Sequence, residues 1–122
     1  MTWTRLPQRR KREKMNVREP SRIDCPGHRR YVKSLECVCR HHPEIKCSGP
    51  MDPHHQQTRG AGGGDDQVVP LCRTHHSLLD SPWWSQKRLE AECGVDFAEI
   101  AAGLWKISKP AQRYRDKLRR AA

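Results

Sequence analysis

The pair Cys72 and His75 forms a Cys-x-x-His motif between a short apolar run and a segment with a helical pattern. This spacing allows a strand-to-helix turn to present two side chains to one zinc ion. The chain needs such a metal, because only 34% of its 122 residues are hydrophobic and it contains a single Phe. A core this small usually requires a metal or a disulfide for stability. We therefore expect one small domain that is braced by metal.

A closed structural zinc site takes four ligands, so two more must come from elsewhere in the chain. The preferred set is Cys37, Cys47, Cys72 and His75. Cys39 is an alternative to either upstream cysteine, since Cys37-Val38-Cys39 is spaced more tightly than the usual Cys-x-x-Cys motif.

Four further residues could in principle bind metal. His41 and His42 are candidates, although we expect them to lie in a solvated loop. Cys25 and Cys93 stand apart from the other cysteines, and we expect both to be free thiols. The segment before Cys25 shows no apolar signal region and no stretch is long enough to cross a membrane, which predicts a cytoplasmic protein with reduced cysteines.

Hydrophobic spacing and helix breakers predict the order of the elements. We expect a short helix over 28–35, a strand ending near His54, a glycine-rich loop over 59–66, a strand over 67–71, and helices over 73–80, 83–92 and 97–107. Asp96 can cap the last helix, Gly94 breaks the one before it, and Pro110 ends the last helix. The predicted fold is small α+β: a zinc-braced ββα unit with flanking helices and basic, partly disordered arms.

Charge divides the chain into three parts. Residues 1–33 carry eleven Lys and Arg against three acids, and residues 106–122 carry seven against one. Residues 34–105 carry six against ten. We therefore expect a flexible basic arm over 1–24, a folded domain over 25–107 and a basic tail over 108–122. Basic arms suit phosphate backbones, although solvated tails would have the same composition.

Two pairs of side chains can do chemistry. His54 and His55 are successive residues of a predicted strand, so they point to opposite sides and suit different roles, one as a metal ligand and one as a base. His76 and Asp80 are four residues apart, which puts them on one helical face within reach of one cation. An imidazole with a carboxylate suits Mg²⁺ or Mn²⁺, and zinc also fits.

The clusters together carry a family resemblance. The runs 28–37, 47–55 and 65–76, with Trp83-Trp84, resemble the HNH (ββα-metal) endonucleases of phages and prophages. They are most similar to the group that includes the RecA-dependent recombination-enhancement (Ref) nuclease. The resemblance covers roughly residues 26–107. It implies a ββα finger with one catalytic divalent metal and a structural zinc.

The resemblance also implies roles for individual residues. His54 matches the first metal ligand, His55 the general base and His76 the helix ligand, while Asp80 stands where relatives often have another His. The central Asn of the motif is missing, and Asp66 or Gln67 takes its place.

The resemblance implies DNA cleavage to a 5′-phosphate and a 3′-hydroxyl, and it allows a requirement for a RecA filament. We expect DNA contacts from Arg59 and Arg73, which flank the site, and from the basic arm. The arm residues concerned are Arg9, Arg10, Lys11 and Arg12. A non-catalytic zinc module that binds DNA, or an accessory protein of recombination, would explain the zinc ligands and the charge but not His54, His55, His76 and Asp80.

Overall fold

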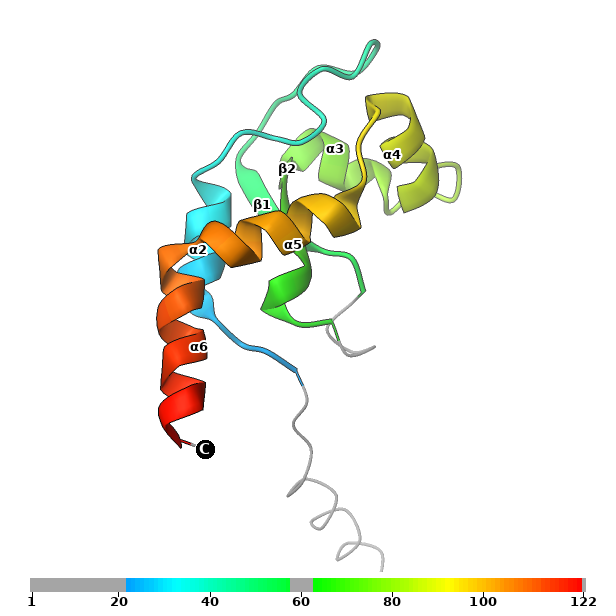
Figure 1. Ribbon diagram of the computed structural model, residues 1–122. Helices are drawn as coiled ribbons and strands as arrows, with labels where there is room; N and C mark the ends of the chain where they lie inside the picture. Colours follow the sequence, from blue (N-terminus) through cyan, green and yellow to red (C-terminus); the bar gives the residue numbers. More distant parts are fainter. Residues whose placement is uncertain (1–21, 58–62, 122) are drawn as a thin grey trace, which may run out of the picture.

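A computed structural model describes residues 22–57 and 63–121, and there a two-stranded antiparallel sheet lies among five helices (Figure 1). The elements are α2 (Pro26–Lys33), β1 (Met51–His55), the 3-10 turn η2 (Asp65–Gln67), β2 (Val68–Cys72), α3 (Arg73–Leu78), α4 (Gln86–Cys93), α5 (Phe97–Ile107) and α6 (Lys109–Ala121). The described part of the chain is therefore a small α+β fold, in which two strands are followed directly by a helix.

The hairpin forms because β2 is a continuous apolar run. All five residues of β2 are buried, whereas those of β1 are half-buried. In the antiparallel register Pro53 faces Pro70 and His55 faces Val68. The Pro70 carbonyl points away from β1 and accepts the Val38 N–H at 3.0 Å. The two prolines thus face each other where neither strand needs an amide donor.

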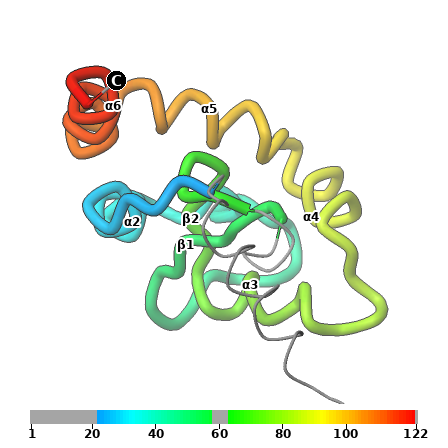
Figure 2. The backbone as a smooth tube through the Cα atoms, turned by 90° about the horizontal axis from the view of Figure 1, so that it is seen from below, coloured from blue at the N-terminus to red at the C-terminus, as the bar shows by residue number. Residues whose placement is uncertain are grey.

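The helices cover the hairpin unevenly. α3 continues directly from β2, and α5 crosses the hairpin with α6 following it (Figure 1). Seen from below, α5 and α6 lie along one side of the molecule, with α6 next to α2 (Figure 2). The core is built from β2, α4, α5 and the loop after α2; its buried residues are Cys37, Cys39, Val69, Leu71, Cys72, Leu89, Phe97 and Ala101.

Capping explains most of the helix boundaries. The predicted cap of α5 is confirmed, since Asp96 accepts the N–H groups of Ala98 and Glu99 at 3.0 and 3.3 Å. Gly94 ends α4 with a φ of 68°, also as predicted. The start of α4 was placed too early, because Ser85 caps the helix and Trp83-Trp84 precede it. Likewise α3 ends at Leu78 and turns before Asp80.

The expectation of a partly disordered C-terminal tail is wrong for residues 109–121, which form helix α6. Pro110 does end α5, but it also begins the next helix, where a missing amide costs nothing. Ser108 caps α6 by accepting the Ala111 N–H at 3.2 Å. Ala111 is buried and the Tyr114 ring packs on Trp105, with 5.9 Å between centroids. These packing contacts stabilise the helix against the repulsion among its many basic side chains.

No helix within residues 22–57 and 63–121 combines the length and the apolar character that crossing a membrane requires.

Among residues 22–57 and 63–121, one side chain has buried polar atoms that lack a hydrogen-bond partner. His28 of α2 is fully buried and packs edge-on against Trp105, with 4.9 Å between ring centroids. Neither of its ring nitrogens has a hydrogen-bond partner in the part of the chain that the structure describes. Burial therefore lowers the pKa of His28 from its ordinary 6.5, against smaller opposing effects of Asp65 and Asp66.

We predict that His28→Leu stabilises the fold, by about 1 kcal/mol at neutral pH, because it removes an unpaired buried polar group. Below about pH 6.5 the unfolded chain binds a proton at His28 that the folded chain does not, so the stability of the native protein falls as the pH falls. The gain from His28→Leu should therefore grow between about pH 7.5 and about pH 5.5. Urea unfolding at several pH values measures it, and a variant less stable than the native chain at both ends would contradict the buried, unpaired state.

Candidate functional site

Four candidate metal ligands meet at the junction of β2 and α3: Cys37, Cys47, Cys72 and His75. The Sγ atoms of Cys72, Cys37 and Cys47 lie 3.1, 3.7 and 3.7 Å from the His75 Nδ1 atom. All four ligand atoms lie within 4.8 Å of one another. Tetrahedral zinc, with bonds of about 2.3 Å to sulfur and about 2.0 Å to nitrogen, separates such atoms by about 3.5 Å. The cluster can therefore hold a structural zinc ion.

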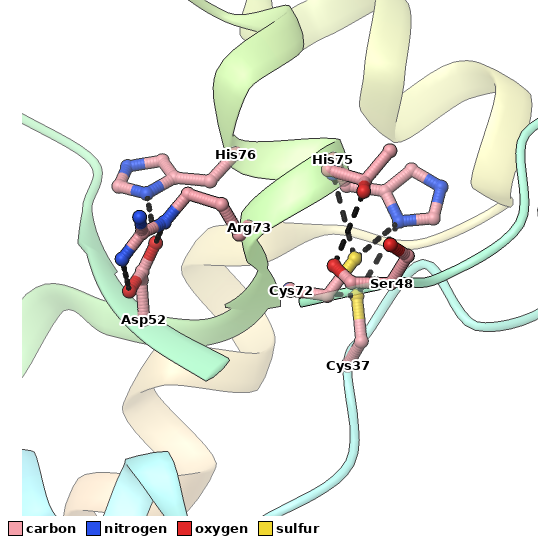
Figure 3. Close-up of polar contacts among 8 residues, drawn as sticks. Cys37, Ser48, Asp52, Cys72, Arg73, His75 and His76 are labelled. Carbon is pink, nitrogen blue, oxygen red and sulfur yellow. Dashed lines mark hydrogen bonds and ion pairs between the residues drawn. The ribbon is translucent and has the colours of Figure 1, made fainter. Parts of the chain in front are cut away.

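Hydrogen bonds from neighbouring groups orient two of these side chains for metal binding. The Cys37 Sγ atom accepts the N–H groups of Cys39 and Cys72, each at 3.3 Å. The other ring nitrogen of His75, Nε2, donates to the Ile45 carbonyl at 3.0 Å, which leaves the lone pair on Nδ1 (Figure 3 shows the side chain). A ligating histidine typically donates its second N–H in this way.

The close spacing of Cys37 and Cys39 shifts the pKa values of their thiols in opposite directions. A hydrogen bond from the Cys39 thiol, with help from backbone N–H groups, lowers the pKa of Cys37 well below its ordinary range. The same contact, with burial, raises the pKa of Cys39. Position and not the pKa identifies the candidate ligand, since the Cys37 Sγ atom lies within 4.8 Å of the other three ligand atoms and Cys39 is not part of that group.

The cluster decides between the alternatives that the sequence left open. The preferred set of four is the one that the structure brings together, and Cys39 is not part of it. The expectation for His42 is wrong: it is buried, bonds Glu92 at 2.9 Å and accepts two backbone N–H groups. His41 is exposed as expected. Cys25 and Cys93 are free thiols, of which Cys25 is buried.

A second polar group lies on the other side of α3 (Figure 3). Asp52 of β1 accepts two hydrogen bonds from Arg73, at 2.7 and 3.0 Å, and one from the His76 Nδ1 atom at 3.0 Å. These contacts, that of Arg73 above all, lower the pKa of Asp52 to about 2. Asp52 therefore stays ionised and orients the His76 ring through its Nδ1 atom, with the Nε2 atom on the opposite side of the ring.

His54 joins this group from β1. Its ring lies 5.1 Å from that of His76, centroid to centroid. The Nε2 atom of His54 donates to the Gln86 side-chain oxygen at 3.0 Å, which leaves the lone pair on Nδ1. Burial lowers the pKa of His54, so the imidazole is neutral. The two imidazole rings thus stand side by side, each with one nitrogen oriented by a polar side chain.

His55, the next residue along β1, binds a different partner. Its Nε2 atom donates to the Asp65 Oδ1 atom at 2.8 Å. The other oxygen of Asp65 accepts the Cys25 N–H at 2.6 Å and a short contact from Arg29. Asp65 is completely buried. Burial acts to raise the pKa of Asp65, but the bonds from His55 and Cys25 and the charge of Arg29 lower it overall.

The sequence did not indicate Asp65 as the partner of His55. The resemblance instead placed Asp66 or Gln67 where the motif has its central Asn. Asp66 is half-buried and no hydrogen bond of its side chain involves His55, while Gln67 contributes its backbone carbonyl to Gln56. Asp65 and Asp66 both lie in the turn η2 that precedes β2, so only the contacts of the folded chain distinguish them.

The remaining predicted site residues either lie away from the two histidines of β1 or fall outside the described residues. Asp80 is exposed in the turn after α3, where it borders the same shallow cavity as Asp52 and His76. Among the described residues, its oxygens do not form a compact ligand group with His54 and His76. Arg73 is bound to Asp52. Arg9, Arg10, Lys11, Arg12 and Arg59 lie outside the described residues.

We predict that the zinc content separates the two members of the Cys-x-C pair. Cys37→Ser should lose the metal and with it most of the stability of the domain, since a structural zinc supplies much of the folding energy of a small domain. Cys39→Ala should keep one zinc per chain, although its cavity lowers the melting temperature. Metal analysis of the purified variants is the measurement, and zinc loss in the Cys39 variant alone would reverse the assignment.

Comparison of the chain with protein-family models, with curated proteins and with solved structures found no match to any of them.

Proposed function

We propose that this chain is a metal-dependent endonuclease of the HNH (ββα-metal) type that hydrolyses phosphodiester bonds in DNA. The observation that carries the proposal is the pair of polar groups on β1: His55 is held by a buried carboxylate, and His54 stands beside His76. Neighbouring strand residues thus have separate partners, as a base and a metal ligand would require. The motifs that resemble the HNH family run through the same residues.

In this mechanism His55 is the general base. Its Nε2–H is committed to Asp65, so the Nδ1 atom carries the lone pair that accepts a proton from the attacking water. The carboxylate holds the ring in one tautomer and stabilises the imidazolium that forms, as a buried Asp does for other catalytic histidines. The products would be a 5′-phosphate and a 3′-hydroxyl, as the resemblance implies.

The proposal assigns the divalent cation to His54 and His76, whose rings lie 5.1 Å apart, centroid to centroid. The lone pairs on His54 Nδ1 and His76 Nε2 are the ones that would hold it, and Gln86 and Asp52 orient the two rings. Asp80, at the edge of the same cavity as His76, is the candidate third ligand. A Mg²⁺ or Mn²⁺ ion bound there would neutralise the charge that grows on the phosphate oxygens in the transition state.

The proposal includes an origin and a partner. By its resemblance the chain would be a phage or prophage protein that acts in the cytoplasm of a bacterial host, in recombination or DNA processing, with a RecA filament as a partner. A zinc-stabilised DNA-binding module without activity is the competing function. It would use the cysteine cluster in the same way but gives His54, His55 and Asp65 no role.

Plasmid nicking tests the proposal and the base together. The full chain is incubated with plasmid and Mg²⁺ or Mn²⁺, with and without RecA and single-stranded DNA. We expect cleavage in at least one condition, and His55→Ala should reduce its rate about 10²- to 10⁴-fold, since general-base catalysis contributes that much.

His41→Ala is the matched control, because His41 is exposed and belongs to neither polar group. It should cleave at the native rate, and both variants should keep their zinc. Absence of cleavage under all conditions, together with DNA binding, would favour the non-catalytic module; native cleavage by His55→Ala would remove His55 from the mechanism.

A second pair of variants tests the assignment of the positioning residue. Asp65→Asn keeps the shape of the side chain but removes its charge, and we expect kcat to fall about 10- to 100-fold with little change in KM, as for other partners that orient a functional histidine. Asp66→Asn, one residue on, should leave kcat unchanged. Steady-state cleavage of a labelled duplex measures both, and the reverse order of effects would return the role to Asp66.

A further inference from the structure

A groove of about 630 Å³ runs between the start of α2 and the exposed side of α6. The two helices lie side by side in both views of the backbone (Figures 1 and 2). They approach closely at Gly27, where a Cβ atom would lie 3.0 Å from the Pro110 Cβ atom. The groove is therefore a defined feature of the packed helices, separate from the cysteine cluster and from the polar groups of β1.

The lining of the groove is strongly basic. Four cations line it: Arg30 from α2, and Arg113, Lys117 and Arg120 from α6. Within residues 22–57 and 63–121, none of the four forms an ion pair. The two acids at the groove are bound to other arginines, Asp24 to Arg29 and Asp116 to Arg119.

This arrangement is unfavourable for the isolated chain. Arg113 and Lys117 are four residues apart on α6, so two like charges face each other along one side of the helix, and Arg120 extends the row. An ordinary solvated helix face would alternate acids with bases at this spacing. A row of unpaired cations along a groove complements a regular polyanion.

Hydrogen bonds link one lining residue of the groove to the candidate base. Cys25 lines it, and the Cys25 N–H donates to Asp65 at 2.6 Å. Asp65 in turn binds His55 at 2.8 Å. Two hydrogen bonds thus connect the rim of the groove to the residue that would activate water.

We propose that the groove between α2 and α6 binds the phosphodiester backbone of DNA beside the bond that is cut. The four cations contact successive phosphates and hold the strand in register with His55. The inference rests on the proposed function for its substrate, but the binding that it describes does not require cleavage.

Salt-dependent DNA binding tests the proposal. Fluorescence anisotropy with a labelled duplex, without added Mg²⁺ or Mn²⁺, gives Kd at several salt concentrations. In the variant Arg113→Gln/Lys117→Gln/Arg120→Gln we expect affinity to fall at least about tenfold at fixed salt, and the slope of log K against log salt to shrink by about 3, one for each lost phosphate contact.

The matched control is Lys46→Gln/Lys87→Gln/Lys106→Gln, which removes the same charge from three exposed positions away from the groove. Its salt slope should change much less. Equal losses in both triple variants would show attraction by net charge alone and overturn the proposal, as would an unchanged slope in the groove variant.

Two further measurements keep the test decisive. Arg30→Gln probes the groove from α2 and should reduce the slope by about 1 even if the α6 variant unfolds. Vesicles of phosphatidylserine serve as an alternative polyanionic surface. If the groove variants lost vesicle binding but kept DNA binding, the groove would be a membrane contact and the proposal would be wrong. Cleavage by the native chain is scored separately, so a failure of the nuclease proposal is distinguishable.

Discussion

The cysteine–histidine cluster at the end of β2 is the constraint on which the rest of the site depends. Its ligands come from the loop after α2, the loop before β1, the end of β2 and the first turn of α3. Because His75 must face the cluster, the rotation of α3 about its axis is fixed. Consecutive residues of a helix lie about 100° apart, so His76 is turned toward Asp52 and His54. The position of this one cluster thus determines where the second polar group lies.

Much of this could be predicted from the sequence, because the relevant signals are local. The Cys-x-x-His spacing indicated two candidate metal ligands at the start of α3, the apolar run indicated β2, and Asp96 and Gly94 marked helix ends. Each depends on residues within a few positions of one another. The choice of Cys37 over Cys39 needed the fold, since spacing alone leaves both within reach of the metal.

The features that were missed depend on contacts distant in sequence. Asp65 meets Cys25, forty residues earlier, and no local pattern distinguishes it from Asp66. His42 is buried because it meets Glu92, fifty residues later. Helix α6 was not predicted because its sequence is highly basic. Ala111, Tyr114 and Leu118 do have helical spacing, but the contact that stabilises Tyr114 is with Trp105 of the preceding helix.

The facing prolines of the hairpin fix the strand register that gives His54 and His55 their different surroundings. Opposed pairs in an antiparallel ladder alternate between bonded and non-bonded, and Pro53 and Pro70 share a non-bonded pair. A slip of the strands by one residue would move one proline to a bonded position and lose a ladder bond. That slip is also the one that would turn every side chain to the opposite face and exchange the surroundings of the two histidines. The two prolines thus destabilise any register shifted by one residue. This is the shift that would put each imidazole in the environment of the other.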